Sequence, residues 1–264
     1  MTGACDWILA GSDTALAAKV VHVWRVPMEA TEAAVTQLRS FLSPDESGRA
    51  GRFHFEVHRR RFIIARGCLR AILSRYIGIP AADICFEYGS YGKPRLAPLD
   101  RAAHSLEFNL AHSGDFALYA VTRLGEVGVD LELIQPDVAR DEIARYFFSR
   151  AEIAVFRGLH EHARPQAFFD CWTRKEAFIK AKGMGLSLPL DQFDVTLAPA
   201  EPAALLSTRW DEAEAGRWSL RAIEVAPGYA GAVAIQTHEW DLHCWTAEAG
   251  ALLPAPSSPP RRGP

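Results

Sequence analysis

The stretch "FFDCWTRKEAFIKAKGMGLSLPLDQFDVTL", residues 168–197, reads as a long helix, a glycine-rich stop, a proline and a short strand. Its apolar residues, among them Phe168, Cys171 and Phe178, recur at helical spacing. The stretch "RRRFIIARGCLRAILSRYIGIPAADICFEYG", residues 59–89, repeats this order of helix, Gly-Ile-Pro stop and strand. The two stretches indicate an internal duplication.

A hairpin-like segment follows each unit, with a Ser-Gly-Asp turn within residues 106–123 and a Pro-Gly turn within residues 220–237. We therefore predict an α+β fold with two similar halves, each a long helix packed on a small antiparallel sheet. The predicted units are an N-terminal half (1–126), a C-terminal half (127–249) and a disordered, Pro-rich tail (250–264).

Composition excludes several classes of protein. The chain has 264 residues, 49% of them hydrophobic and 23% charged, which is typical of a globular protein with a proper core. Its net charge of −3 gives no general attraction to nucleic acid or to an anionic membrane. Five scattered cysteines without a C-x-x-C pair argue against a disulfide framework or a zinc site. With no signal peptide and no membrane-spanning run, we expect a cytoplasmic protein with reduced thiols.

Carboxylates stand out in two segments of the second half. In "EVGVDLELI", residues 126–134, a strand would project Asp130 and Glu132 from one face. Two adjacent carboxylates repel each other unless they are solvated or bind a cation, so an exposed strand face is the plainer alternative. On the long helix, Glu176 and Lys180 share a stripe with Trp172, where the plainer alternative is a surface ion pair.

Groups that suit phosphate oxygens occur in the first half. His112 and Ser113 lie at a predicted turn, Lys93 lies beside a proline in "YGKPRL", and Arg61 belongs to a basic run on the first long helix. Each could instead be ordinary turn, loop or surface chemistry. Together with the three carboxylates, they favour a Mg²⁺-dependent enzyme that acts on a phosphate or pyrophosphate ester.

The combination of "VGVDLE" with "WTRKEAFIKAKG", some forty residues downstream, resembles the signature of the 4′-phosphopantetheinyl transferases, in particular their monomeric group. The resemblance extends over about residues 40–235 and includes "YGKP", "FNLAHS", "FFSRAE" and "GLSLPLDQF". It implies two similar halves in a pseudo-twofold arrangement with the active site between them. It also implies coenzyme A as donor, Mg²⁺ as cofactor and the serine of an acyl or peptidyl carrier protein as acceptor.

Carried over by position, the resemblance assigns roles to individual residues. The metal-binding carboxylates implied are Asp130, Glu132 and Glu176. Glu176 is also the implied base, and Lys180 the implied catalytic contact to the CoA phosphates. The implied CoA-binding residues are Arg61, Lys93, His112, Ser113 and Lys180, and Glu152 matches an acidic residue near the metal. Glu46 departs from the pattern, because relatives often carry a basic residue near it.

Two other functions remain open on the sequence. The same carboxylates could serve a Mg²⁺-dependent phosphohydrolase that uses water in place of serine. The chain could also be a non-catalytic module that docks on carrier proteins, although its intact carboxylates and Lys180 argue against this. Because both halves lie in one chain, we expect a monomer.

Overall fold

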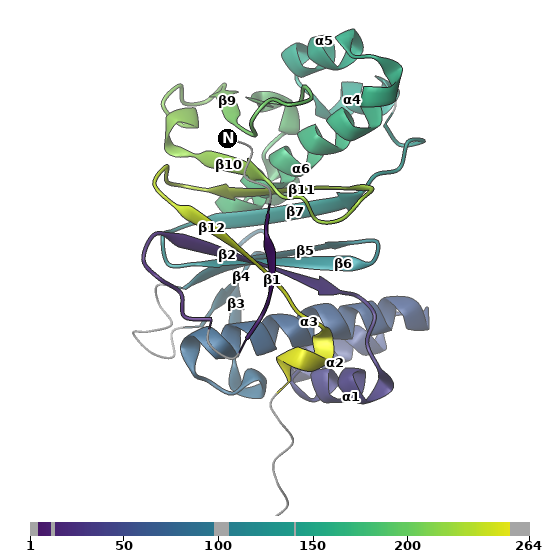
Figure 1. Ribbon diagram of the computed structural model, residues 1–264, viewed down its shortest axis with the longest axis vertical. Coiled ribbons are helices and arrows are strands. Elements are labelled where there is room, and N and C mark those ends of the chain that lie inside the picture. The colour runs from purple at the N-terminus through teal and green to yellow at the C-terminus, as the bar shows by residue number, and fades with distance from the viewer. Residues whose placement is uncertain (1–4, 12–13, 98–105, 140, 254–264) are drawn as a thin grey trace, which may run out of the picture.

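The computed structural model describes residues 5–11, 14–97, 106–139 and 141–253. The chain forms four layers, with helices α1 to α3 on one outer side, two sheets in the middle and helices α4 to α6 on the other outer side (Figure 1). The predicted α+β fold is confirmed, and each long helix covers the outer face of one sheet.

The first sheet combines the N-terminal strands with one strand from the far end of the chain. Its order is β1 (Trp7–Leu9), β12 (Asp241–Thr246), β2 (Val20–Pro27), β6 (Phe116–Thr122) and β5 (Glu107–Ser113). Strands β2, β6 and β5 are antiparallel, and β5 and β6 are the hairpin expected within residues 106–123. Strand β12 pairs in parallel with both β2 and β1.

Three helices cover the outer face of the first sheet. They are α1 (Glu32–Ser40), α2 (Pro44–Gly51) and α3 (Glu56–Ile77). Alternate residues of β2 and β6, such as Trp24 and Tyr119, point toward them and pack with Ile64 and Cys68 of α3. Helix α3 ends at Gly78, whose φ of 71° is readily adopted by glycine.

The second half repeats this plan around a smaller sheet. Its strand order is β10 (Ser219–Ala222), β11 (Tyr229–Ile235) and β7 (Val127–Leu133), all antiparallel. Its helices are α4 (Asp141–Phe147), α5 (Arg150–Gly158) and α6 (Arg164–Lys182). Helix α6 ends at Gly183 with a φ of 67°, as α3 does at Gly78. Phe168, Cys171 and Phe178 of α6 pack on this sheet, as their spacing predicted.

A two-stranded ladder follows each long helix. The ladders are β3 (Phe86–Tyr88) with β4 (Pro94–Leu96), and β8 (Phe193–Val195) with β9 (Leu205–Thr208). The order of a leading strand, two helices, a long helix, a short ladder and a hairpin therefore occurs twice. This repetition supports the predicted pair of similar halves.

The two sheets lie face to face, and a third apolar cluster fills the space between them. Val23 and Ala120 of the first sheet and Val129, Leu131 and Val233 of the second belong to this cluster. Val129 and Leu131 therefore point away from α6, which leaves the opposite face of β7 for Gly128, Asp130 and Glu132. The predicted division of faces along this strand is confirmed.

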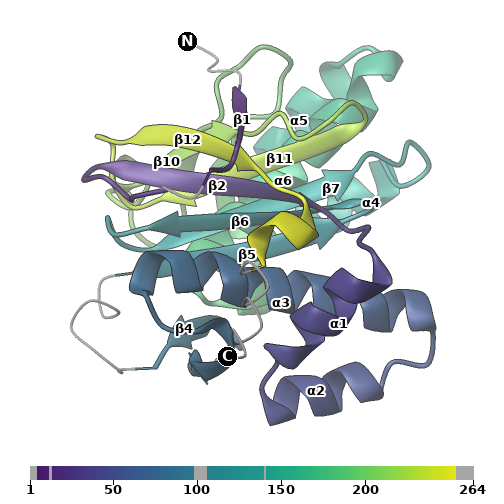
Figure 2. The ribbon, with the colours of Figure 1, turned by 60° about the horizontal axis from the view of Figure 1, so that its bottom comes forward.

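The end of the chain differs from the sequence prediction. The predicted tail begins at residue 250, but Ala249–Leu252 forms a 3-10 helix whose Ala249 and Leu252 pack in the first core. Figure 2 shows this turn against α3 and β12 beside β2. Strand β12, which belongs to the predicted C-terminal half, thus lies in the first sheet, and the border at residue 126 stays a prediction. The proposed disorder of 254–264 lies outside the described residues.

The thiols also differ from the prediction. Cys5 and Cys244 form a disulfide across 239 residues of sequence, so the expectation of reduced thiols alone was wrong. The pairing of β1 with β12 brings these cysteines together, and no local spacing in the sequence indicates it. Cys68, Cys85 and Cys171 are free. Among the described residues, no helix has the length and apolar character needed to cross a membrane.

Candidate active site

Strand β7 and helix α6 approach each other closely at Gly128. A Cβ at this position would overlap the carbonyl oxygen of Ala177 and the nitrogen of Ala181, so only glycine fits without a shift. Asp130 lies two residues further on the same face of β7. Its Oδ1 accepts a hydrogen bond of 2.6 Å from Lys180 Nζ on α6. The glycine of "VGVD" therefore allows the contact between the strand carboxylate and the helix lysine.

Asp130 is a buried carboxylate with one oxygen left over. Its side chain is almost inaccessible, and Oδ2 is buried without a hydrogen-bond partner among the described residues. Burial raises the pKa of Asp130 to about 7; Lys180 opposes this shift, and the charges of Glu132 and Glu176 add to it. An unpaired oxygen beside other carboxylates indicates a place for a cation.

Glu132 is held by a residue of the other half. The hydroxyl of Ser113, at the end of β5, donates to Glu132 Oε2 at 2.7 Å and accepts from the Leu133 amide at 3.1 Å. Further along β5, Asn109 Oδ1 accepts from the Val129 amide at 3.0 Å. Strands β5 and β7 are thus joined through side chains, which fixes the carboxylate edge of β7 against the first half.

Glu176 completes the carboxylate group from α6. It lies one helical turn before Lys180, and its side chain is half-buried. Burial raises the pKa of Glu176; the Lys180 charge lowers it, and the Glu132 charge raises it further. Burial lowers the pKa of Lys180, but the charge and hydrogen bond of Asp130 outweigh this, so its net shift is upward. Glu176 therefore combines a raised pKa with a permanent cation beside it.

The carboxylates alone do not form a closed metal cage. Within the described ranges, no group of three His, Cys, Asp or Glu side chains is arranged to hold a metal ion. The free Oδ2 of Asp130 and the oxygens of Glu132 and Glu176 are nevertheless the hard ligands that Mg²⁺ takes. Mg²⁺ usually keeps waters and binds substrate phosphates besides one or two carboxylates. These residues therefore fit an ion shared with a phosphate ligand.

The predicted His112 lies near the end of β5, just before the turn at Gly114 and not in the turn itself. Arg61 of α3 pairs with Asp115 at 3.2 Å, and the Asp115 amide donates to the Tyr229 hydroxyl at 2.9 Å. Partial loss of hydration lowers the pKa of His112, and the charges of Lys180 and Arg61 lower it further. Lys180 and Arg61 thus both lie within electrostatic range of His112, an arrangement that suits an anion.

The sequence is similar to those of known proteins. The sequence model described as the 4′-phosphopantetheinyl transferase superfamily matches residues 126–247, and the one described as the 4′-phosphopantetheinyl transferase N-terminal region matches residues 26–123. The 4′-phosphopantetheinyl transferase HetI of a Nostoc strain is 38% identical over 240 residues, which cover 90% of this chain and 97% of HetI.

The chain belongs to the 4′-phosphopantetheinyl transferase superfamily. The 4′-phosphopantetheinyl transferase Sfp of Bacillus subtilis is 32% identical, over 74% of this chain and 82% of Sfp. The 4′-phosphopantetheinyl transferase AcpT of Escherichia coli is 39% identical, over 43% of this chain and 55% of AcpT. Both family models together span the two halves of the fold.

One predicted CoA ligand of the transferase has a different partner in the structure. Lys93 is buried, and its Nζ donates to the carbonyl oxygens of Val127 at 3.2 Å and Ala181 at 2.8 Å. Burial lowers the pKa of Lys93. The ammonium thus holds the end of α6 against the start of β7, and a phosphate contact from it would have to use its remaining hydrogen. The phosphate role of Lys93 stays a prediction.

The resemblance placed Glu152 near the metal, but its carboxylate has other partners. It is buried on α5 and accepts from Lys175 at 2.8 Å and from the amides of Ser149 and Val195, each at 2.8 Å. These bonds leave Glu152 no share in the carboxylate group around Asp130. Sequence reasoning did not single out Lys175, although its position next to Glu176 in "RKEAF" was visible.

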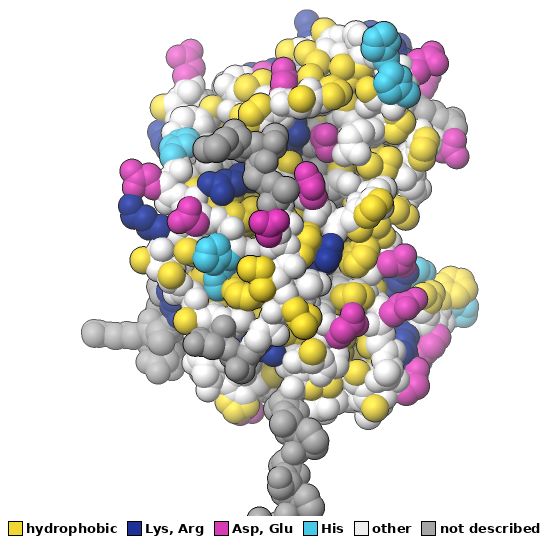
Figure 3. Space-filling model, in the orientation of Figure 1, with side chains coloured by type: hydrophobic (Ala, Val, Ile, Leu, Met, Phe, Trp, Pro, Cys, Tyr) yellow, Lys and Arg dark blue, Asp and Glu magenta, His cyan; other side chains and the backbone are white. Residues whose placement is uncertain are grey.

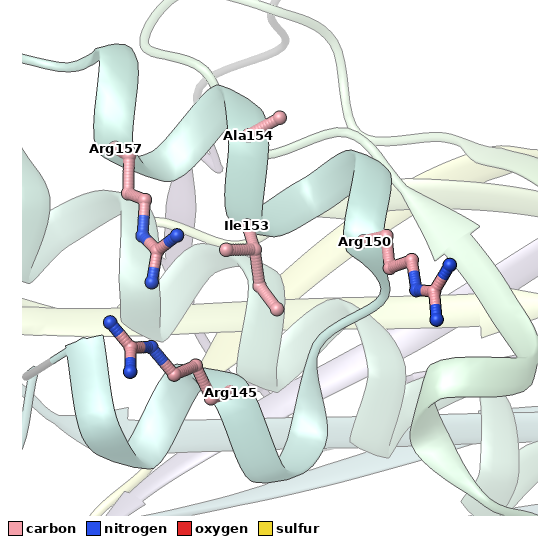
Figure 4. Close-up of a pocket in the computed structure, with 5 residues that line it drawn as sticks. All are labelled: Arg145, Arg150, Ile153, Ala154 and Arg157. Atoms are coloured by element: carbon pink, nitrogen blue, oxygen red, sulfur yellow. The ribbon is translucent and has the colours of Figure 1, made fainter.

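A hollow in the transferase lies elsewhere, between α4 and α5. It has a volume of about 520 Å³ and is lined by Arg145, Arg150, Ile153, Ala154 and Arg157. Figure 4 shows Arg145 and Arg157 facing each other across it, with Arg150 on the other side of Ile153. On the face in Figure 3, by contrast, basic side chains are scattered among acidic ones. Arg157 and Arg145 pair with Asp141 at 2.9 and 3.9 Å, so the charge of the hollow is partly neutralised.

Proposed function

We propose that this transferase moves the 4′-phosphopantetheine group of CoA to a serine of an acyl or peptidyl carrier protein, with Mg²⁺ as cofactor. The observation that carries this proposal is the buried Asp130–Lys180 pair of 2.6 Å, with the unpartnered Oδ2 of Asp130 among the carboxylates. The family of the chain supports the reaction class. The product is holo-carrier protein, and adenosine 3′,5′-bisphosphate leaves.

The step is a displacement at phosphorus. The serine oxygen forms a bond to the phosphorus on the pantetheine side of the CoA pyrophosphate, and the bond from this phosphorus to the bridging oxygen breaks. Glu176 or a nearby water takes the serine proton. Lys180 stays charged and would stabilise the leaving bisphosphate.

Asp130, Glu132 and Glu176 would hold the metal in this proposal. A bound Mg²⁺ would neutralise charge on the pyrophosphate and lower its resistance to attack. Ser113 would orient Glu132 through the hydrogen bond of 2.7 Å. Arg61 and His112 would meet the phosphates of CoA from the first half, and Lys93 would hold the two halves in register beside them.

The carrier protein is the proposed partner for the basic hollow. Arg150 would attract carboxylates, with Arg145 and Arg157 beside it sharing Asp141, so the acceptor is expected to present an acidic surface there. Strand β7, which carries Asp130 and Glu132, ends at Leu133, and α4 begins at Asp141, so the hollow follows the carboxylate strand closely in the sequence. We further propose a monomer, since one chain supplies both halves, and a cytoplasmic reaction, where CoA and carrier proteins are made.

Intact-protein mass spectrometry tests the function. An apo carrier protein incubated with this protein, CoA and Mg²⁺ should gain one phosphopantetheine unit, and EDTA should abolish the gain. Consumption of CoA without a gain on several carrier types would instead support the phosphohydrolase. A carrier that binds without gain while CoA stays intact would support the docking module.

A further inference from the structure

The two long helices are anchored in the same way. Arg70 lies eight residues before the terminal Gly78 of α3, and Lys175 lies eight residues before the terminal Gly183 of α6. Each basic side chain is fully buried and meets the glutamate of a capping box on the preceding helix. We call each arrangement a helix anchor, consisting of the basic residue and this glutamate.

The anchor of the second half is fully satisfied. Lys175 Nζ donates to the carbonyl oxygens of Leu190 and Phe193, each at 2.6 Å, and pairs with Glu152 at 2.8 Å. These contacts use all the hydrogens that an ammonium has. The other oxygen of Glu152 accepts from the Val195 amide at 2.8 Å. Helix α6 is thereby tied to α5 on one side and to the segment before β8 on the other.

The anchor of the first half is built in the same way. Arg70 Nε donates to Glu46 Oε2 at 2.7 Å, and its guanidinium donates to the carbonyl oxygens of Ala81 at 3.1 Å and Ile84 at 2.7 Å. Arg66 adds a second ion pair to Glu46. Glu46, which departs from the family pattern, therefore serves the fold and not CoA. Both anchors join a long helix to the helix before it and the loop after it.

Only the second anchor adjoins the reaction centre. Lys175 immediately precedes Glu176, and Lys180 follows within one and a half turns of the same helix. Any slide or rotation of α6 moves these side chains relative to Asp130 on β7. The residue next to Arg70 is Ala71, a core residue without chemistry of its own. The helix anchor therefore lies next to proposed reacting groups in the second half and next to a core residue in the first half.

We propose that Glu152 and Lys175 are positioning residues for Glu176 and Lys180: their buried ion pair fixes the placement of α6 on which transfer depends. This inference rests on the proposed function. A displacement of reacting groups by about 1 Å can lower a rate by about a hundredfold. Because Lys175 is next to Glu176, a small shift of this anchor would be enough to lower the rate of transfer.

The test is a comparison of matched variants in the two anchors. Glu152→Asp keeps the charge but shortens the side chain by one methylene, so Lys175 can keep its partner only if α6 and α5 shift. Glu46→Asp makes the same change in the first anchor. We expect similar losses of melting temperature, but a fall in kcat of about tenfold or more with an unchanged KM for CoA in the Glu152 variant alone.

Two readouts separate positioning from damage to the fold. Hydrogen exchange of the α6 amides, measured without CoA or metal, should become faster around Glu176 in Glu152→Asp and stay as in wild type in Glu46→Asp. Glu152→Gln, which removes the charge, should lower kcat further, and Lys175→Arg, which resembles the first anchor, should keep most of it. Equal kcat in Glu152→Asp and wild type would overturn the proposal, as would an equal fall in Glu46→Asp.

The wild-type protein keeps the two proposals distinguishable. If wild type transfers no phosphopantetheine to any carrier, the proposed function fails, and the hydrogen-exchange comparison alone then decides whether the anchor orders α6. If wild type is active and Glu152→Asp is equally active, the function stands and the positioning role is wrong.

Discussion

The hydroxyl of Ser113 lies 2.7 Å from the carboxylate of Glu132, and this bond crosses from one half of the fold to the other. The same hydroxyl accepts from the Leu133 amide, so both its donor and its acceptor are used. The sequence resemblance implied that Ser113 binds CoA, whereas in the structure its hydroxyl donates a hydrogen bond to the Glu132 carboxylate. Substitution of a residue that supports a metal ligand should change the kinetics differently from substitution of a residue that binds CoA.

Ser113→Ala should weaken metal binding more than CoA binding. Without the hydroxyl, Glu132 loses a partner and the Leu133 amide is left unpaired. We expect the Mg²⁺ concentration for half-maximal transfer to rise by about tenfold or more, with KM for CoA nearly unchanged. Ser113→Thr keeps the hydroxyl and is the control. The reverse pattern, a raised KM for CoA at an unchanged Mg²⁺ requirement, would return Ser113 to the CoA site.

Glu176→Gln should lose transfer but keep CoA. The amide has nearly the same shape but cannot accept the serine proton and ligates a metal poorly. We expect kcat to fall by about a hundredfold or more, which is typical for removal of a positioned base. Calorimetric CoA binding should remain within a few-fold of wild type. The exposed Glu142→Gln on α4 is a matched control that should leave both quantities unchanged.

Local patterns in the sequence were sufficient for much of the fold and the site. Period-two alternation placed Asp130 and Glu132 on one face of β7, and helical spacing placed Glu176 and Lys180 on one stripe of α6. Turn residues located the β5–β6 and β10–β11 hairpins. Both kinds of signal depend on residues close together in the chain, which is why they could be read without coordinates.

Contacts between distant segments could not be predicted in this way. The Cys5–Cys244 disulfide depends on the parallel pairing of β1 and β12. No turn in the sequence joins these two strands, so local residues do not indicate that they pair. The same holds for Lys93, whose ammonium satisfies backbone carbonyls of two segments far away in sequence. The resemblance placed Glu152 near the metal, because a sequence motif does not show which way a carboxylate points.

The pKa of Asp130 predicts that Mg²⁺ binding releases a proton. Burial raises this pKa from 3.8 to about 7 in the metal-free protein, so below pH 7 Asp130 is largely protonated, and a cation favours its ionised form. Calorimetry in buffers of different ionisation enthalpy should show release of about one proton near pH 6 and almost none near pH 8.5. Equal proton release at both pH values would contradict the assignment, and Asp130→Asn should show none.

The same shift sets the sign of a stability effect. Between pH 3.8 and about 7, the folded metal-free protein holds a proton at Asp130 that the unfolded chain has lost. The contribution of Asp130 to the free energy of unfolding therefore falls as pH rises through this window. Added Mg²⁺ should offset this loss near neutral pH.

Arg150→Glu should impair use of the carrier protein and spare CoA. Arg150 lines the hollow between α4 and α5, and reversal of its charge would repel an acidic acceptor. We expect KM for the carrier to rise by roughly tenfold at low salt, with KM for CoA unchanged, and the difference to shrink at high salt. Arg39→Glu, an exposed arginine on α1, is the matched control. Equal KM values for the carrier in both variants would exclude this hollow as the docking surface.

Gly114→Ala should destabilise the turn that follows His112 and joins β5 to β6. Gly114 has a φ of 54°, which costs energy for any residue with a Cβ, and that Cβ would overlap the hydroxyl of Tyr229. This hydroxyl accepts from the Asp115 amide at 2.9 Å, so it cannot move aside without loss of that bond. The free energy of unfolding should fall by about 1–3 kcal/mol, measured by chemical denaturation.

Two further variants separate backbone strain from the clash. Gly216→Ala, where an added Cβ meets open space at an ordinary φ, should leave the free energy of unfolding nearly unchanged. In the double variant Gly114→Ala with Tyr229→Phe, the clash is relieved and the positive φ remains, so only part of the stability should return. If Gly114→Ala unfolds at the same denaturant concentration as wild type, the turn is not held by Tyr229.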